Sequence, residues 1–243
     1  MNLQKFVFHF VFLFSLQSFS AVRENNFLIL PEQNLLGGLN EEQFHRVISS
    51  FEKKIAPIVK AQGGELIVDR LWNNPTVNAF AYSMLGKWTI NLYGGYARHP
   101  AMTEELLLMS LCHEAGHFMG GHPKKFFSGR SYEGQADYYS TLICMKEMWR
   151  NEDNQIAIAG KAADPTVKEK CRGNALCERI SMLSLAMARF DALFGDGPSP
   201  DFSTPEKMQV KKTNSGYPSP QCRLDTYFAG VLNNPRPRCW YFD

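Results

Sequence analysis

Residues 113–122 read HEAGHFMGGH, and the organisation of the fold depends on this stretch. The segment just before it has Thr103 in a capping position and acids in its first turn, which predicts a helix that ends at two consecutive glycines. On that helix His113 and His117 lie one turn apart on the same face, so their imidazole nitrogens can converge on one metal ion. Glu114 then points toward the open position of the ion.

This pattern is the one found in H-E-x-x-H zinc hydrolases, where two histidines bind the metal and the glutamate is a general base. A catalytic zinc ion needs a third protein ligand. His122 would be that ligand in the longer H-E-x-x-H-x-x-G-x-x-H pattern of the metzincins, but the third histidine of that pattern would fall on Pro123. We therefore reject His122 as the third ligand.

The stretch EGQAD, residues 133–137, offers a better third ligand in Glu133. A second helix antiparallel to the first would bring its N-terminal turn beside His117. Asp137 lies one turn after Glu133, where its carboxylate could accept the other N–H of a ligating histidine. The small residues Gly134 and Ala136 would let the two helices approach closely.

Together, HEAGHFMGGH and EGQAD resemble the zinc peptidase family that includes the bacterial heat-shock protease HtpX and the CAAX prenyl proteases, metallopeptidase family forty-eight. In this family the third ligand is the glutamate of an E-x-x-x-D motif, which corresponds to Glu133, with Asp137 as its aspartate. His122 stands where the family often has a histidine. The resemblance runs from about Asn78 to Leu224.

Two further segments carry this resemblance. NAFAYSMLGKWTINLYGG, residues 78–95, is similar to the Asn-Ala-Phe-Ala segment of the family and its following strand, and GYPSPQCRL, residues 216–224, is similar to a late His-Pro segment. Tyr217 stands where the family usually has histidine, and Arg223 matches the family's arginine. The resemblance implies that one of these two side chains stabilises the oxyanion, which a neutral phenol can also do. Many relatives have transmembrane helices that this sequence lacks.

Hydrophobic spacing predicts a mostly helical α+β fold with a small β-sheet. The resemblance implies that this fold is zincin-like and that the edge strand of the sheet flanks the helix that carries the histidines. We expect that edge strand to be KWTINLY and to pair with an extended substrate. The polar segment 151–170 is expected to loop out. Helices are predicted from Asn40 to about Pro57 and over 103–119, 131–149, 175–194 and 223–232, and strands over 65–72, 78–83 and 87–93.

Residues 1–20 have a lone lysine, a short apolar run and small residues at the end, which predicts a signal peptide followed by a single metallopeptidase domain over 21–243. Hydrophobic residues make up 44% of the chain and charged residues 21%, as in globular proteins. The net charge of +2 includes no basic block that would indicate nucleic-acid binding. We expect an exported protein, periplasmic or secreted.

The chain has six cysteines, an even number that favours disulfides in an oxidising compartment. Cys171 could pair with Cys177 and Cys222 with Cys239. Cys112 and Cys144 would then link two helices, but both could equally be free buried thiols. The sequence has no C-x-x-C pair, which argues against a cysteine zinc site.

The predicted function is zinc-dependent endopeptidase activity on exposed or unfolded polypeptide, with one Zn²⁺ per chain bound by His113, His117 and Glu133, and with Glu114 as the general base. Envelope protein quality control would be a suitable setting. The first alternative is a zinc-containing polypeptide-binding or chaperone-like module with little proteolysis. The second alternative is a hydrolase of cell-wall peptides.

Overall fold

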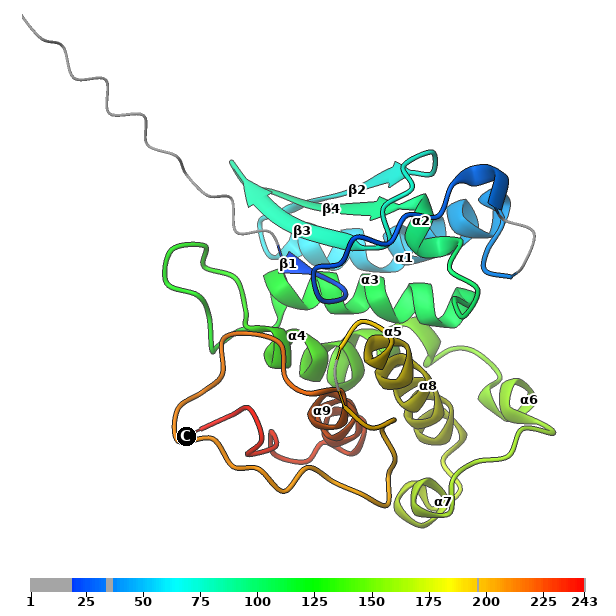
Figure 1. Cartoon of the computed structure of the whole chain (residues 1–243), viewed down its shortest axis with the longest axis vertical. Helices are drawn as coiled ribbons and strands as arrows, with labels where there is room; N and C mark the ends of the chain where they lie inside the picture. Colours follow the sequence, from blue (N-terminus) through cyan, green and yellow to red (C-terminus); the bar gives the residue numbers. More distant parts are fainter. Residues whose placement is uncertain (1–18, 34–36, 196, 243) are drawn as a thin grey trace, which may run out of the picture.

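The computed structural model describes residues 19–33, 37–195 and 197–242, and it shows an α+β fold in which about 47% of the residues are helical (Figure 1). The predicted signal peptide, residues 1–20, lies outside the described part except for Phe19 and Ser20, which form β1. The elements are β1 (Phe19–Ser20), a 3₁₀ turn (Pro31–Gln33), α1 (Glu41–Ala61), β2 (Glu65–Leu71), β3 (Ala79–Met84), β4 (Lys87–Tyr93), α2 (Gly94–Ala97), α3 (Glu104–Met119), α4 (Glu133–Tyr139), a π-helical turn (Ser140–Cys144), α5 (Met145–Trp149), α6 (Asn154–Ile158), α7 (Pro165–Cys171), α8 (Ala175–Ala192) and α9 (Pro220–Leu232).

The small sheet has the strand order β1-β3-β4-β2. β3 and β4 form an antiparallel hairpin, and β2 pairs with β4 in parallel along its whole length, from Glu65 beside Lys87 to Leu71 beside Tyr93. The prediction that KWTINLY is the edge strand was therefore wrong, because β4 has a partner on both sides. The outer strands are β2 and the two-residue β1, which pairs with β3.

Helix α1 covers the sheet and begins as predicted, with a capping box between Asn40 and Gln43. It does not end near Pro57 but continues to Ala61, with the proline inside it. An interior proline removes one helical hydrogen bond and strains the preceding turn. The buried side chains of Ile55 and Val59, on either side of the proline, offset that cost by packing into the core.

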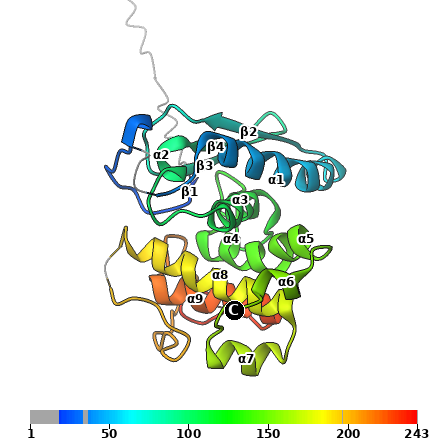
Figure 2. The ribbon, with the colours of Figure 1, turned by 90° about the vertical axis from the view of Figure 1, so that its right-hand side faces the viewer.

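Helix α3 runs through the middle of the molecule, with the sheet and α1 on one side and α4, α5, α8 and α9 on the other (Figure 2). The side chain of Thr103 caps its first turn, as predicted. Every residue from Leu106 to Phe118 is buried. A helix buried on all sides has apolar residues around its whole circumference, so its few polar residues, including both histidines, lie inside the protein.

The next helical stretch begins at Glu133, two residues after the predicted start, and is continuous to Trp149 apart from the π-helical turn. At this turn the hydroxyl of Thr141 donates to the carbonyl oxygen of Tyr227 in α9, at 2.7 Å. Gly230 of α9 packs so closely here that a Cβ atom would lie 2.3 Å from the Thr141 hydroxyl. The widened turn and the missing side chain let the two helices meet.

The polar segment 151–170 does not loop out as predicted, because it contains α6 and most of α7. Each of these short helices starts with an aspartate, Asp153 or Asp164, whose carboxylate accepts a backbone N–H of the first turn. Pro165 then occupies the first position of α7, where its missing N–H has no cost. Local capping therefore produced helices in a segment without an amphipathic pattern.

All three expected cysteine pairs are disulfides: Cys112–Cys144, Cys171–Cys177 and Cys222–Cys239. The first pair links α3 to the π-helical turn, so the alternative of free thiols at these positions was wrong. Three disulfides are consistent with an oxidising compartment. Within residues 19–33, 37–195 and 197–242, no helix has the length and apolarity needed to cross a membrane.

Candidate metal centre

The three predicted metal ligands come together in the structure. His113, His117 and Glu133 are buried, and each offers one ligand atom within 4.8 Å of the other two. The approach is possible because α3 and α4 run antiparallel: the backbone N–H of Ser131 donates to the carbonyl oxygen of His117 at 2.9 Å, and Ala136 packs on Gly116. This is the helix arrangement expected from the short loop between the two motifs.

The spacing of the ligand atoms fits a tetrahedral ion. Oε2 of Glu133 lies 3.3 Å from Nε2 of His113 and 3.7 Å from Nε2 of His117. Ligands placed about 2.1 Å from a tetrahedral ion are about 3.4 Å apart. Neither Oε2 of Glu133 nor Nε2 of His113 has a hydrogen bond to any residue in the described part of the chain. Buried polar atoms of this kind call for a partner, and a divalent cation would supply it.

The opposite nitrogen of each imidazole ring is held by the protein. Nδ1 of His113 lies 2.7 Å from Oδ1 of Asp137, and Nδ1 of His117 lies 3.0 Å from the carbonyl oxygen of Ser131. Both oxygens accept, so both Nδ1 atoms carry the proton and both Nε2 atoms are left to bind a metal. The structure thus places Asp137 where the sequence predicted it.

Asp137 is part of a buried network of charges. The guanidinium of Arg223 donates from Nε to Oδ2 of Asp137 at 2.9 Å and from Nη2 to Oδ1 at 2.7 Å. Its remaining nitrogen, Nη1, lies 3.0 Å from Oδ2 of Asp191 in α8, and Nη2 also donates to the hydroxyl of Tyr227 at 2.9 Å. Arg223 therefore contacts the carboxylate that orients His113, and its three nitrogens are all engaged by protein groups.

The pKa values of these groups follow from burial and from this network. Burial works against charging the imidazole of His113, but the Asp137 carboxylate outweighs it and raises the pKa of His113 to about 10. Burial lowers the pKa of His117 to about 4, although Glu133 opposes this shift. Burial alone would raise the pKa of Asp137, yet the Arg223 guanidinium holds it below its ordinary value. A cation at the site must therefore displace a proton from His113.

Glu114 is fully buried beside the ligands, and neither of its carboxylate oxygens has a hydrogen-bond partner among the residues that the structure describes. Burial raises the pKa of Glu114 well above its ordinary value. A buried carboxyl group with a raised pKa holds a proton more strongly than an exposed one. The role of Glu114 as a general base stays a prediction.

Sequence reasoning missed two charged residues near the centre. Asp191 is buried against Arg223, and burial raises its pKa to about 7. The available signal was its place on the apolar face of α8, one turn after the buried Met187, because an acid there needs a buried cation. Arg130 is buried in the loop between the two motifs, where its charge acts on Glu114 and its guanidinium donates to the carbonyl oxygen of Ala81 in β3. No spacing pattern marks it.

Other predicted residues lie elsewhere. His122 is exposed after α3 and lies outside the ligand group. Tyr217 is half-buried in the segment before α9, and its contact with an oxyanion stays a prediction. Gly134 does not make the close approach of α3 to α4, because it packs against Trp240, where a Cβ atom would lie 2.3 Å from the ring.

A cavity of about 620 Å³ lies away from this centre, between the start of α3, α6 and α8. Its lining includes Ile158, Met182, Leu183 and Phe190, and none of the predicted site residues. The cavity is mainly apolar, and none of the three predicted metal ligands lines it.

Replacement of Asp137 by asparagine is expected to weaken the binding of added Zn²⁺ to this group by about 10–100-fold, the usual effect of removing a carboxylate that orients a histidine ligand. An amide can still accept the N–H of His113 but lacks the charge that makes the ligand basic. Competition with a chromogenic chelator would measure the affinity. Asp164→Asn is the matched control, because asparagine caps a helix as well as aspartate. Equal affinities of the Asp137 variant and wild type would contradict this prediction.

Comparisons with protein-family models, with curated proteins and with solved structures give no significant match for this chain. Its class is therefore defined by fold and site alone: an α+β protein in which His113, His117 and Glu133 form a buried group that could hold a metal ion.

Proposed function

We propose that this protein is a zinc-dependent metalloendopeptidase that cleaves exposed or unfolded polypeptide. The observation that carries the proposal is the buried group of two histidines and a glutamate, spaced for a tetrahedral ion, beside the buried carboxylate of Glu114. A zinc ion bound there would polarise the scissile carbonyl and make the attacking water more acidic. The resemblance of both motifs to the HtpX and CAAX prenyl protease family supports the same reading.

Glu114 takes the proton from the attacking water and passes it to the leaving amine. His113 and His117 are kept in one tautomer by Asp137 and by the carbonyl oxygen of Ser131, so the ligand set is formed before substrate binds. Arg223 acts through Asp137 rather than on the substrate, because its nitrogens are engaged in the buried network. Tyr217 is then the proposed oxyanion donor of the two residues that the resemblance implied.

A module that only binds polypeptide has no need for a buried carboxylate without a hydrogen bond. Such a group lowers the stability of the fold, so its presence favours an enzyme over the chaperone-like alternative. Hydrolysis of cell-wall peptides would use the same groups and differs only in substrate.

Metal removal tests the proposal. Protein treated with 1,10-phenanthroline and dialysed should lose cleavage of a quenched unfolded protein substrate, and one equivalent of Zn²⁺ should restore it. Zinc content per chain is measured in parallel, and peptidoglycan fragments are assayed beside the unfolded protein. Cleavage that persists at full rate without metal would contradict the proposal, as would a chain that binds no zinc. Cleavage of the fragments alone would support the cell-wall alternative.

A further inference from the structure

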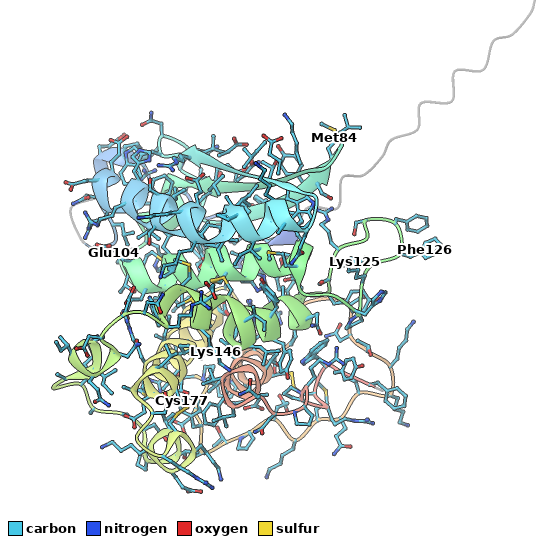
Figure 3. All side chains as sticks on the ribbon, turned by 180° about the vertical axis from the view of Figure 1, so that it is seen from behind. Met84, Glu104, Lys125, Phe126, Lys146 and Cys177 are labelled. Carbon is cyan, nitrogen blue, oxygen red and sulfur yellow. A yellow bond between two sulfur atoms is a disulfide. The ribbon has the colours of Figure 1, made fainter. Side chains whose placement is uncertain are left out.

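Some of the most exposed apolar side chains in the described part of the chain lie on two turns at one end of the molecule. Phe126 and Phe127, in the loop between α3 and α4, are 92% and 99% exposed, and Leu85, at the tip of the β3–β4 hairpin, is 94% exposed. Met84 beside it is 65% exposed. Figure 3 shows Met84 and Phe126 projecting from the same end of the molecule. We call these four side chains the apolar tips.

The loop that carries the two phenylalanines has a hydrogen-bonded base. The backbone N–H of Lys125 donates to the carbonyl oxygen of Arg130 at 2.8 Å. The N–H of Gly129 donates to the carbonyl oxygen of Lys125, also at 2.8 Å. Arg130 also donates to the carbonyl oxygen of Ala81, which ties the loop to β3. The two rings pack edge to face with centroids 5.2 Å apart. They are therefore held outward by a braced loop rather than by a core contact.

The hairpin tip presents its leucine in a strained conformation. Leu85 has φ +51° and Gly86 has φ +81°, the left-handed geometry of a two-residue type I′ turn. Asparagine, aspartate and glycine favour the first position of that turn, whereas leucine there is disfavoured. Leu85 gains little from packing, since it is almost fully exposed. An apolar residue kept at an unfavourable position in water indicates a partner outside the chain.

The charges around the apolar tips are mostly positive; the acid nearest the hairpin turn is Glu65, which lies beside Lys87 in the sheet and whose backbone N–H donates to the carbonyl oxygen of Gly86. The stretches 79–93 and 120–132 contain Lys87, Lys124, Lys125 and Arg130 but no aspartate or glutamate. Lys87 follows the hairpin turn and is exposed, and Lys124 and Lys125 precede the two phenylalanines. Protruding aromatic and aliphatic side chains with lysines beside them match a bilayer surface that carries anionic lipids, because the rings enter the headgroup region while the ammonium groups stay near the phosphates.

We infer that the apolar tips dock this protein on the surface of a membrane that contains anionic phospholipid. A lipid surface fits better than a protein groove, because the side chains stand on two separate convex turns, each with a lysine beside it. The loop with Phe126 and Phe127 also connects the helix of His113 and His117 to that of Glu133. Docking would therefore hold the metal centre close to the bilayer, facing polypeptide at the membrane surface.

Flotation with vesicles of phosphatidylcholine, with and without phosphatidylglycerol, tests the inference without any cleavage assay, so its outcome is separate from that of the proposed function. Wild type should bind the phosphatidylglycerol vesicles, less so at high salt. The double variant Phe126→Ser, Phe127→Ser should partition about tenfold less or weaker still. Leu85→Asn should also bind more weakly yet unfold at an equal or higher temperature, because asparagine suits the turn.

Ile156→Ser is the matched control, since Ile156 is an exposed apolar residue on α6, 74% exposed, outside the two turns, and its loss should leave vesicle binding unchanged. Thermal unfolding of each variant verifies that it is folded. Wild type that floats with neither vesicle would overturn the inference, as would equal binding by wild type and the double phenylalanine variant. A third outcome would assign the apolar tips to protein substrate instead. In that case wild type would bind no vesicles, and the double phenylalanine variant would bind a reduced, alkylated polypeptide more weakly than wild type does.

Discussion

Glu114→Gln is expected to lower the rate of peptide cleavage by roughly a hundredfold to ten-thousandfold, the range for loss of a general base, while zinc stays bound. Glutamine has nearly the shape of glutamate but cannot take a proton from water. The substitution should not unfold the protein, because a neutral amide costs less to bury than a carboxylate. The experiment measures cleavage of a quenched unfolded substrate together with zinc content per chain.

Glu104→Gln is the matched control, because it makes the same change on the same helix, at a partly exposed position in the first turn of α3. Its cleavage rate and zinc content should equal those of wild type. If Glu114→Gln cleaved within about threefold of wild type, Glu114 would not be the general base. If this variant lost its zinc, the carboxylate would belong to the ligand set instead.

Arg223→Met is expected to destabilise the protein by about 3–5 kcal/mol, because it leaves buried carboxylates without their cation. Asp137 and Asp191 both lie against this guanidinium, and both are buried. Their repulsion, now uncompensated, adds to the cost of keeping them out of water. Urea unfolding in the presence of a chelator measures the effect apart from any contribution of bound metal.

Two further variants test the cause. Arg223→Lys keeps the charge, but the single ammonium nitrogen of lysine cannot contact both carboxylates as the three guanidinium nitrogens of arginine do. Its stability should therefore lie between those of wild type and Arg223→Met. The triple variant Asp137→Asn, Arg223→Met, Asp191→Asn removes all three charges and should recover much of the stability lost in Arg223→Met. A triple variant no more stable than Arg223→Met would show that packing of the arginine side chain, and not charge balance, is what stabilises this part of the core.

Much of the metal centre could be predicted from sequence because its geometry is local. His113 and His117 face the same way on any helix, and the short loop to Glu133 leaves the next helix little choice but to run back along the first. The carboxylate of Asp137 follows one turn later. The structure confirms the convergence of the three predicted ligands and the contact from Asp137 to His113.

The strand order of the sheet could not be predicted from local patterns. The residues of β2, β3 and β4 were recognised as strands from their composition, but strand order depends on contacts between distant segments. The parallel pairing of β2 with β4 places KWTINLY inside the sheet. No local pattern distinguishes that order from one with β4 at the edge, because the strand's side chains alternate in the same way in both.

By itself, the sequence determined the helix that carries the histidines, the cap at Thr103 and the spacing of the three predicted ligands, all of which depend on a few neighbouring residues. It left open whether Cys112 and Cys144 are paired, and the structure decided that they are. Only the tertiary structure decided the strand order, the placement of Asp191 against Arg223 and the braced loop that holds Phe126 and Phe127 in water. Charge balance and exposure depend on which surfaces meet, and that is settled by packing across the whole chain.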